Sequence, residues 1–462
     1  MGFNCVRLTW ATYMYTRPNY SSLSVEESLK NFSLQDALAG IAKNNPTFLN
    51  LTVTEARKVV VNELGAKNIM VVLDNHVSQP QWCCGYDDGN GFFGDALFDP
   101  VEWLQGLGTV AELYKDSPNV VAMSMRNELR GPHQNTNEWY QYITLGAEAI
   151  HRGNPSLLVI VSGLSYATDL SFLKEKPLAL NFANKLVYEA HWYSFHHPWQ
   201  MWLSQTNILC ATITRDFMDN SAFVISENNP PVPLFLSEFG VDQRGGNEAD
   251  NRYLSCLLAF IAEYDLDWAL WTLQGSYILR EGVVELEEVY GMFDANWDRV
   301  RNSTIQQRLQ FVKQVIQDPN STYPTYSKLY HPQSGLCAQF GNDNIHAIGC
   351  QNLVSWKPQV KGFLIQLKGR SGCLMAVGDG HPPIFSSDCE KQTTLWKLVS
   401  TSRLHIATRD EQGVYLCLEL NSSDLMILTK KCLCLDEDGV DVPDCADNPE
   451  RQWFKFIPTN KS

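Results

Sequence analysis

The chain has 462 residues, of which 44% are hydrophobic and 19% are charged, and this composition excludes a disordered or collagen-like protein. Its 36 basic and 51 acidic side chains leave a formal net charge of −15, which argues against nucleic acid or an anionic membrane surface as the partner. The apolar runs are much shorter than the roughly 18 residues of a membrane span. We therefore expect no nucleic-acid and no membrane partner.

The first 300 residues or so alternate between short apolar runs and amphipathic helical patterns. The candidate strands are Phe3–Leu8, Ile69–Leu73, Val120–Met125, Leu157–Val161, Leu186–Ala190, Leu234–Leu236 and Trp268–Thr272. The candidate helices include Thr54–Lys67, Val101–Lys115, Asn137–Arg152 (with Gly153 as its stop) and Ile305–Ile316. This alternation predicts an α/β fold with a parallel sheet, and a (β/α)8 TIM barrel accommodates the number of repeats best. An open doubly wound sheet is the alternative.

A barrel of this kind needs eight strands, and the sequence offers seven. We therefore expect the first strand to be missing, together with a signal peptide that preceded it. On this interpretation Phe3–Leu8 and Trp268–Thr272 each lack a strand partner on their outer side, and a gap lies between them.

The composition changes near residue 320, where a linker-like stretch rich in Pro, Asn and Ser follows the last helical pattern. We expect two domains, the barrel over residues 1–322 and a second, all-β domain over residues 330–462. The second domain contains an internal repeat in which a pair of cysteines is followed by a Trp. The repeated residues are Cys337, Cys350 and Trp356, then Cys373, Cys389 and Trp396, then Cys417, Cys432 and Trp453.

Three β-rich units of about 40 residues, each with a cysteine pair and a Trp, predict a β-trefoil. The domain resembles the ricin B-type lectin module, whose Gln-x-Trp motif is present in shortened form as Gln452 and Trp453. The resemblance implies a carbohydrate ligand at the trefoil. From the matching repeat positions we expect the disulfides Cys337–Cys350, Cys373–Cys389 and Cys417–Cys432, which leave Cys434 with Cys445.

The cysteines and the Asn-x-Ser/Thr sequons indicate an exported glycoprotein with disulfide bonds. The sequons lie at Asn19, Asn31, Asn50, Asn302, Asn320, Asn421 and Asn460. Cys83 and Cys84 are neighbours that cannot readily bond each other, so we expect at least one of them to be oxidised, with Cys210 or Cys5 as the candidate partner. An extracellular or cell-wall location follows.

Two glutamates stand at the ends of candidate strands, where a barrel places its chemistry. Glu128 follows the run that starts at Val120, and Glu238 follows the run that starts at Leu234. Two carboxylates that face each other across a barrel mouth are what the cleavage of a glycosidic bond requires.

Further polar and aromatic residues occupy the other strand ends. They are Arg7, His76, Asn127, His191, Tyr193 and Trp271. With the two glutamates, in this order, they resemble the set of glycoside hydrolase family 5, the cellulase family, over residues 1–318. The chain is most similar to plant-type members with a β-trefoil tail. One difference is that the family's Asn-Glu is usually followed by Pro, whereas Leu129 and Arg130 stand here.

The resemblance implies a role for each of these residues. Glu128 would be the general acid/base and Glu238 the nucleophile. Arg7 and the Tyr193 hydroxyl would hydrogen-bond Glu238, and Asn127 would bind the 2-hydroxyl of the sugar. His76 and His191 would position substrate hydroxyls and the acid/base, and Trp271 would stack on the sugar. Trp10, Trp82 and Trp192 are further candidate sugar platforms.

The sequence therefore predicts a retaining O-glycosyl hydrolase, of endoglucanase or mannanase type, that acts on a β-linked polysaccharide or oligosaccharide. It predicts no metal and no cofactor. The alternatives are a carbohydrate-binding protein without turnover and a transglycosylase that uses the same residues.

Overall fold

The computed structural model describes residues 1–226, 230–280, 282–341, 344–359, 362–436, 445 and 448–461. The chain forms two compact units. The first consists of Met1–Trp192, Phe217–Gly240 and Asp267–Arg299, and the second of Tyr193–Asp216, Val241–Leu266 and Val300–Ser462. Within the described residues, none of the helices combines the length and the apolar character needed to cross a membrane.

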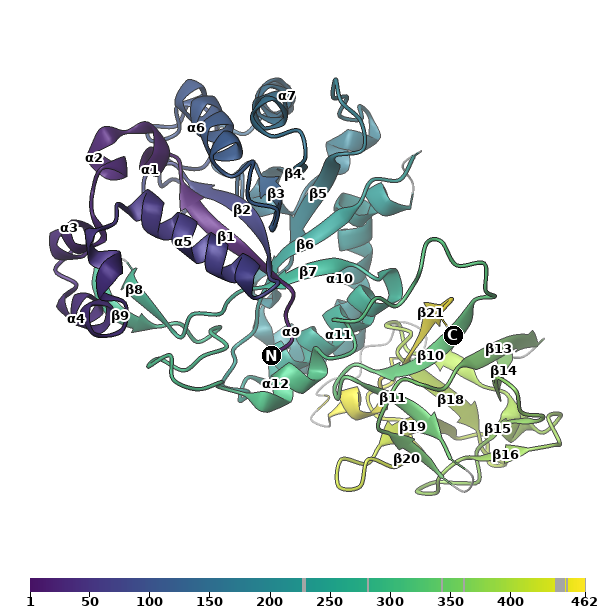
Figure 1. Ribbon diagram of the computed structural model, residues 1–462. Helices are drawn as coiled ribbons and strands as arrows, with labels where there is room; N and C mark the ends of the chain where they lie inside the picture. The colour runs from purple at the N-terminus through teal and green to yellow at the C-terminus, as the bar shows by residue number, and fades with distance from the viewer. Residues whose placement is uncertain are drawn as a thin grey trace. The chain divides into compact units, whose positions relative to one another are not determined.

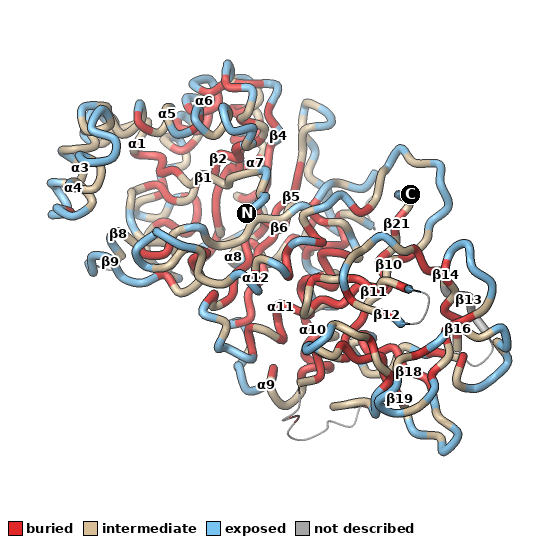
Figure 2. Tube along the Cα trace, turned by 60° about the horizontal axis from the view of Figure 1, so that its bottom comes forward, coloured by how far each residue is buried: buried red, intermediate tan, exposed pale blue. Residues whose placement is uncertain are grey.

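The first unit is built on one parallel sheet of seven strands in the order β1-β2-β3-β4-β5-β6-β7, which forms a nearly closed barrel (Figure 1). The strands are β1 Cys5–Ala11, β2 Met70–Val77, β3 Val120–Ser124, β4 Leu158–Ser162, β5 Leu186–His191, β6 Leu234–Phe239 and β7 Asp267–Leu270. Each overlaps one of the seven predicted runs, so the predicted (β/α) barrel is confirmed. Most residues of the five inner strands, β2 to β6, are buried and are drawn red in Figure 2, whereas β7 has no buried residue and β1 is buried only at its end.

The sheet is open between its first and last strands. Among the described residues, β1 pairs with β2 alone and β7 with β6 alone, as we expected for these two edges. In the part of the chain that the structure describes, β1 and β7 are not paired by backbone hydrogen bonds, but side chains from the two edges are in contact. The ring of Phe3, just before β1, packs edge-on against Trp268 on β7, with 6.0 Å between the ring centroids.

Three long helices of the first unit alternate with the strands: α5 Val53–Ala66, α6 Pro100–Leu113 and α7 Thr136–Gly153. Each begins at a side-chain cap that satisfies free backbone amides, namely Thr52, Asp99 and Asn135. Gly153, predicted as a stop signal, is instead the last helical residue, and Asn154 caps the end.

Shorter elements complete the first unit. They are α1 Tyr13–Thr16, α2 Pro18–Ser21, α3 Val25–Asn31, α4 Gln35–Asn44, η1 Pro46–Asn50, α8 Leu164–Ala167, η2 Ser171–Lys174, η4 Ala222–Ile225, and the antiparallel hairpin β8 Ser276–Arg280 with β9 Val283–Glu287.

The second unit begins with helices and continues as an all-β region in several sheets. The helical elements are η3 Ser194–His196, α9 Trp199–Ser204, α10 Thr206–Asn220 (whose last residues belong to the first unit), α11 Glu248–Tyr264 and α12 Ser303–Arg308. The last of these ends well before Ile316, where the predicted helix ended.

The all-β region comprises residues 326–459. Its strands are β10 Tyr326–His331, β11 Leu336–Phe340, β12 Ile345–Ala347, β13 Val354–Gln359, β14 Gly362–Leu367, β15 Cys373–Met375, β16 Ile384–Ser386, β17 Lys397–Val399, β18 His405–Arg409, β19 Tyr415–Leu420, β20 Ile427–Lys431 and β21 Lys455–Thr459, with the 3-10 turns η5 Gln392–Thr394 and η7 Pro449–Gln452.

The cysteine repeat corresponds to three antiparallel hairpins, β11–β12, β15–β16 and β19–β20. The first strand of each hairpin carries the first cysteine of a pair. The disulfides Cys337–Cys350, Cys373–Cys389, Cys417–Cys432 and Cys434–Cys445 are all formed, so the predicted connectivity of this region is confirmed.

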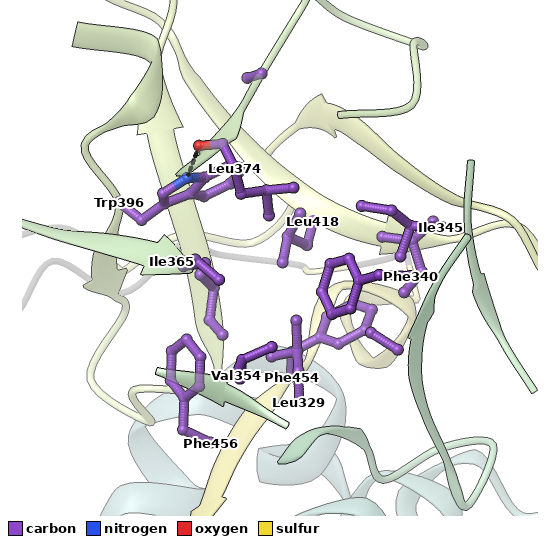
Figure 3. Close-up of a cluster of buried hydrophobic side chains, with 14 of the residues drawn as sticks. Leu329, Phe340, Ile345, Val354, Ile365, Leu374, Trp396, Leu418, Phe454 and Phe456 are labelled. Carbon is purple, nitrogen blue, oxygen red and sulfur yellow. Dashed lines mark hydrogen bonds between the residues drawn. The ribbon is translucent and has the colours of Figure 1, made fainter. Parts of the chain in front are cut away.

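One apolar core joins the hairpins of the all-β region (Figure 3). Trp396 lies in this core with no exposed surface, and its Nε1 donates a hydrogen bond to the carbonyl oxygen of Leu374 at 2.9 Å. Trp453 is also fully buried, and the side chain of Trp356 lies outside the described residues. Two of the repeated Trp residues are therefore interior side chains.

The remaining cysteines correct the sequence-based expectation. Cys210 on α10 is bonded to Cys256 on α11, and Cys83 is bonded to its neighbour Cys84. Cys5 is a free cysteine in β1. Cys210 and Cys5 are thus not partners of the Cys83–Cys84 pair, and sequence adjacency did not prevent that bond.

We predict that Trp396→Ala lowers the free energy of unfolding by about 3 to 5 kcal/mol, because it removes a fully buried indole and leaves a cavity. Urea unfolding followed by circular dichroism measures the change. The matched control is Trp199→Ala, since Trp199 is 59% exposed and should change the free energy by less than about 0.5 kcal/mol. Equal effects of the two substitutions would contradict the role of Trp396 in the core.

Candidate active site

Arg7, on β1, is the centre of a buried ion-pair network at the ends of the barrel strands. Its Nη1 lies 3.0 Å from Oε2 of Glu238, and its Nη2 lies 3.1 Å from Oδ1 of Asp74. Nη2 also donates to Oδ1 of Asn127 at 2.7 Å. Burial opposes the charge on Arg7, but Asp74 and Glu238 outweigh it and raise the pKa of Arg7 above its ordinary value. One guanidinium thus binds side chains from β2, from β6 and from the segment that follows β3.

Asp74 connects Arg7 to His76 along β2. Asp74 and His76 are two positions apart on β2, so their side chains lie on the same face of the strand. His76 Nδ1 lies 2.7 Å from Oδ2 of Asp74. Burial favours the neutral form of Asp74, but the charges of Arg7 and His76 outweigh it and lower the pKa of Asp74. Asp74 is therefore a buried carboxylate.

Glu128, His191 and Glu238 form the cluster in which the two predicted catalytic carboxylates meet. His191 Nδ1 lies 2.9 Å from Oε1 of Glu128 and 4.0 Å from Oε1 of Glu238. One ligand atom from each of the three lies within 4.8 Å of the others. Because His191 and Glu238 are register partners on β5 and β6, the parallel ladder itself brings them together.

The backbone at Glu128 has φ 45°, a left-handed conformation that is uncommon for a residue with a side chain. Such conformations persist where the surrounding structure fixes them, and they cluster at functional sites. Here Arg130, which is fully buried, donates from Nη1 to the carbonyl oxygen of Glu128 at 2.8 Å. Arg130, two residues after Glu128, thus helps to fix the backbone turn at Glu128.

The surroundings of the Glu128–His191 pair favour a proton on the imidazole over one on the carboxyl group. Burial disfavours charge on His191, but Glu238 and the hydrogen bond to Glu128 outweigh it and raise the pKa of His191. For Glu128, burial is likewise outweighed by the hydrogen bond and charge of His191, which lower the pKa of Glu128. Both shifts favour an ionised Glu128 beside a protonated His191.

Trp271 lies against His76, with the two rings stacked at 5.8 Å between centroids and 11° between planes. Its Nε1 donates to Oε2 of Glu288 at 3.4 Å, and Glu288 is buried. His76 thus holds one face of the indole and Glu288 holds its Nε1 edge, and this rigid arrangement suits a platform for a sugar ring.

The structure brings seven of the predicted residues into one network in the first unit: Arg7, His76, Asn127, Glu128, His191, Glu238 and Trp271. Tyr193 belongs to the second unit, where it is buried and stacks on Phe195 at 4.7 Å between centroids. Of the further candidate platforms, Trp10 and Trp192 are buried, and Arg280 lies over the ring of Trp82 at 4.7 Å.

Several functional neighbours were missed from the sequence. Asp74 and Glu189 stand two residues before His76 and His191, so the period of two along a strand could have identified them. Glu189 accepts from the Ser124 hydroxyl at 2.5 Å, and its burial raises its pKa. Arg130 and Glu288 lie in loops, and no spacing rule would have found them.

In two groups of side chains in the described part of the chain, potential metal-ligand atoms lie within 4.8 Å of one another. In one, Glu128, His191 and Glu238, the imidazole Nδ1 is already hydrogen-bonded to Glu128. In the other, His76, Cys83 and Cys84, the two sulfurs are bonded to each other and are not thiolate ligands.

A parallel (β/α) barrel with two close carboxylates, a buried arginine and a stacked tryptophan at its strand ends has the features of a glycosidase. The model of the cellulase family, glycosyl hydrolase family 5, matches residues 1–276. The chain belongs to this family.

A relative that is similar over the whole chain agrees with that assignment. A glycosyl hydrolase 5 family protein of Chamaecyparis obtusa is 46% identical over all of this chain and 84% of its own length. An endoglucanase of Paenibacillus polymyxa is 20% identical over 50% of this chain and 59% of its own length.

Among solved structures, the catalytic domain of the major endoglucanase from Xanthomonas campestris pv. campestris has a TM-score of 0.50 and 20% identity, covering 66% of this chain and 83% of that one. An endocellulase variant of Pyrococcus horikoshii in complex with cellotetraose has a TM-score of 0.53 and 16% identity, covering 68% and 83%. At these identities the structures show a shared fold.

We predict that Asp74→Asn lowers the free energy of unfolding at pH 7 by about 3 kcal/mol, because it leaves the charge of Arg7 buried with one carboxylate fewer. The folded-state pKa of Asp74 lies below its ordinary value of 3.8. The ionised carboxylate therefore contributes its full stabilisation of the fold at any pH well above 3.8. The contribution is lost only as pH falls through the folded-state value. The difference between variant and wild type should therefore be equal at pH 7 and pH 5 and should narrow below pH 3.8.

Urea unfolding across this pH range tests the expectation, with Asp216→Asn as the control. Asp216 is exposed and lies 3.9 Å from Arg215, so its substitution should change the free energy by less than about 0.5 kcal/mol. A difference that disappears between pH 7 and pH 5 would contradict the assignment of Asp74 as the ionised partner of Arg7.

Proposed function

We propose that the protein is a retaining glycosidase that hydrolyses a β-linked glucan, with Glu238 as the nucleophile and Glu128 as the general acid/base. The observation that carries the proposal is the close approach of these two side chains, whose carboxylate oxygens lie within 4.8 Å of each other. Retaining enzymes place their carboxyl groups about 5 to 5.5 Å apart, whereas inverting enzymes leave about 6.5 to 9.5 Å for a water. The short separation favours retention.

The substrate class is inferred from two kinds of support. The endoglucanase relatives and the structurally similar endocellulase with cellotetraose favour a β-glucan over a mannan. The site itself is lined by hydrogen-bonding groups and a stacked tryptophan, which suit an uncharged sugar ring.

A carbohydrate ligand at the all-β region is a separate proposal. Gln452 there is a buried structural bridge between Glu419 and the backbone of Leu433.

In the first step, a carboxylate oxygen of Glu238 attacks the anomeric carbon while the bond from that carbon to the leaving oxygen breaks. Glu128 supplies the proton that the leaving oxygen takes up, which yields the free alcohol and a glycosyl ester on Glu238. Arg7, 3.0 Å from Glu238, stabilises the attacking carboxylate and keeps it ionised.

The proton for this step comes from the Glu128–His191 pair, which holds one proton across a 2.9 Å hydrogen bond. In the resting site the raised pKa of His191 and the lowered pKa of Glu128 favour the ionic form of the pair. A sugar that fills the site and displaces water penalises separated charges, so it favours the neutral pair with a protonated Glu128. In the second step Glu128 removes a proton from water, and the resulting hydroxide oxygen displaces Glu238 from the anomeric carbon.

The six disulfides favour an oxidising compartment for the folded protein. We infer an extracellular or cell-wall location, where a polysaccharide substrate would be accessible.

We predict that Glu238→Gln abolishes hydrolysis of β-glucans and aryl β-cellobiosides, because an amide cannot form the ester intermediate. Glu63→Gln, the same change at an exposed position of α5, should leave turnover unchanged. A panel of glucans, mannans and aryl glycosides, assayed by reducing ends and released phenol, measures both. Full activity of Glu238→Gln would contradict the assignment, and a wild-type protein that binds these sugars without turnover would favour a carbohydrate-binding protein.

Azide should restore turnover to the alanine variants with opposite stereochemistry. In Glu238→Ala, azide attacks the anomeric carbon directly and yields the α-glycosyl azide. In Glu128→Ala, azide opens the ester on Glu238 and yields the β-glycosyl azide. Proton NMR of the products distinguishes them. The β-azide from Glu238→Ala together with the α-azide from Glu128→Ala would reverse the two roles, and the same anomer from both variants would refute them.

A further inference from the structure

The disulfide between Cys83 and Cys84 lies directly against the catalytic network. Nδ2 of Asn127 donates towards both sulfurs, at 3.7 Å to Sγ of Cys83 and 3.5 Å to Sγ of Cys84. A ring nitrogen of His76 and the two sulfurs lie within 4.8 Å of one another. Sulfur is a weak acceptor, but here two sulfurs face the same amide.

The opposite end of the Asn127 amide is fixed by Arg7. Its Oδ1 accepts a charge-assisted hydrogen bond from Nη2 of Arg7 at 2.7 Å. Because a guanidinium has donors and no acceptor, the carbonyl end must face Arg7 and the amino end must face the sulfurs. The orientation of this amide is therefore determined by its two neighbours.

The loop that carries the disulfide is tied to the acid/base segment by the buried Arg130. Its Nε donates to the carbonyl oxygen of Gly85 at 2.8 Å, and its Nη2 lies 2.7 Å from Oδ2 of Asp88. The same guanidinium holds the carbonyl oxygen of Glu128. The sulfurs are thus held in a constant position relative to Glu128 and Asn127.

We propose that the Cys83–Cys84 disulfide is a positioning group that sets how Asn127 presents its amide to the sugar. Nδ2 carries two protons. The two bonded sulfurs act as one acceptor group and engage one N–H, so the second N–H remains for the 2-hydroxyl of the substrate. Without the bond, the two sulfurs would separate, and each could take one N–H in competition with the sugar. This inference rests on the proposed function, in which Asn127 binds that hydroxyl.

The test compares Cys83→Ala/Cys84→Ala with wild type on 2,4-dinitrophenyl β-cellobioside and on its analogue without the 2-hydroxyl at the reacting sugar. We expect kcat/KM on the parent substrate to fall about tenfold, less than the hundredfold that a 1 Å misplacement can cost. On the 2-deoxy analogue the fall should be less than about twofold, because the contact that the disulfide adjusts is absent. A purely structural role would slow both substrates equally and would overturn the proposal.

Two further variants sharpen the comparison. Asn127→Ala should remove the sensitivity, so that adding the two cysteine substitutions to it costs nothing more on the parent substrate. Cys210→Ala/Cys256→Ala removes a disulfide that joins α10 to α11 and should leave kcat/KM on both substrates unchanged. Peptide mass mapping of the native protein must show Cys83 and Cys84 bonded; free thiols, or thiols that bind a metal, would refute the proposal.

Failure of the proposed function is distinguishable from failure of this inference. If the wild type hydrolyses neither substrate, the proposed function fails, and the side-chain amide of Asn127 still reports on the sulfurs. In protein labelled with nitrogen-15 asparagine, the NH2 resonances that Asn127→Ala removes should shift in Cys83→Ala/Cys84→Ala and stay in place in Cys210→Ala/Cys256→Ala. Unshifted resonances in the first variant would overturn the proposal.

Discussion

The site depends on the buried ion pairs that the guanidinium of Arg7 forms with Asp74 and Glu238. The Arg7 side chain is 6% exposed, and so little solvent reaches it that its charge must be balanced by protein groups. Asp74 and Glu238 provide that balance from two other strands, and Asn127 accepts from the same group. Since the three partners belong to β2, to β6 and to the segment after β3, one cation fixes the relative positions of Asp74, Glu238 and Asn127.

Because Arg7 and His191 both lie close to Glu238, the charge of this proposed nucleophile also affects its neighbours. Glu238 is the leading favourable cause of the raised pKa of His191. In the ester of the proposed mechanism that cause is absent, and the Glu128–His191 pair has already given its proton to the leaving oxygen. A proton that Glu128 then takes from water would therefore be drawn less strongly to the imidazole than in the resting site.

Sequence reasoning found the strands and the strand-end residues because both follow simple periodic rules. The barrel strands are short apolar runs, and Glu128, His191 and Glu238 stand where such runs stop. Side chains alternate between the two faces of a strand, so this period of two would also have identified Asp74 from His76. Arg130 and the Cys83–Cys84 bond could not be found in this way, because their contacts join loops whose folding depends on tertiary packing. The resting charges of Glu128 and His191 depend on their mutual distance, which no sequence pattern contains.

The all-β region shows a simple rule in its covalent connectivity. Eight cysteines can be joined in 105 ways, yet each here is bonded to the next cysteine along the chain, with sequence separations of 13, 16, 15 and 11 residues. A ribosome delivers the chain from its N-terminus, so every cysteine meets its native partner before any later competitor has been made. In an oxidising compartment, this order of synthesis would favour the native pairing within the region and reduce the slow reshuffling of mispaired bonds.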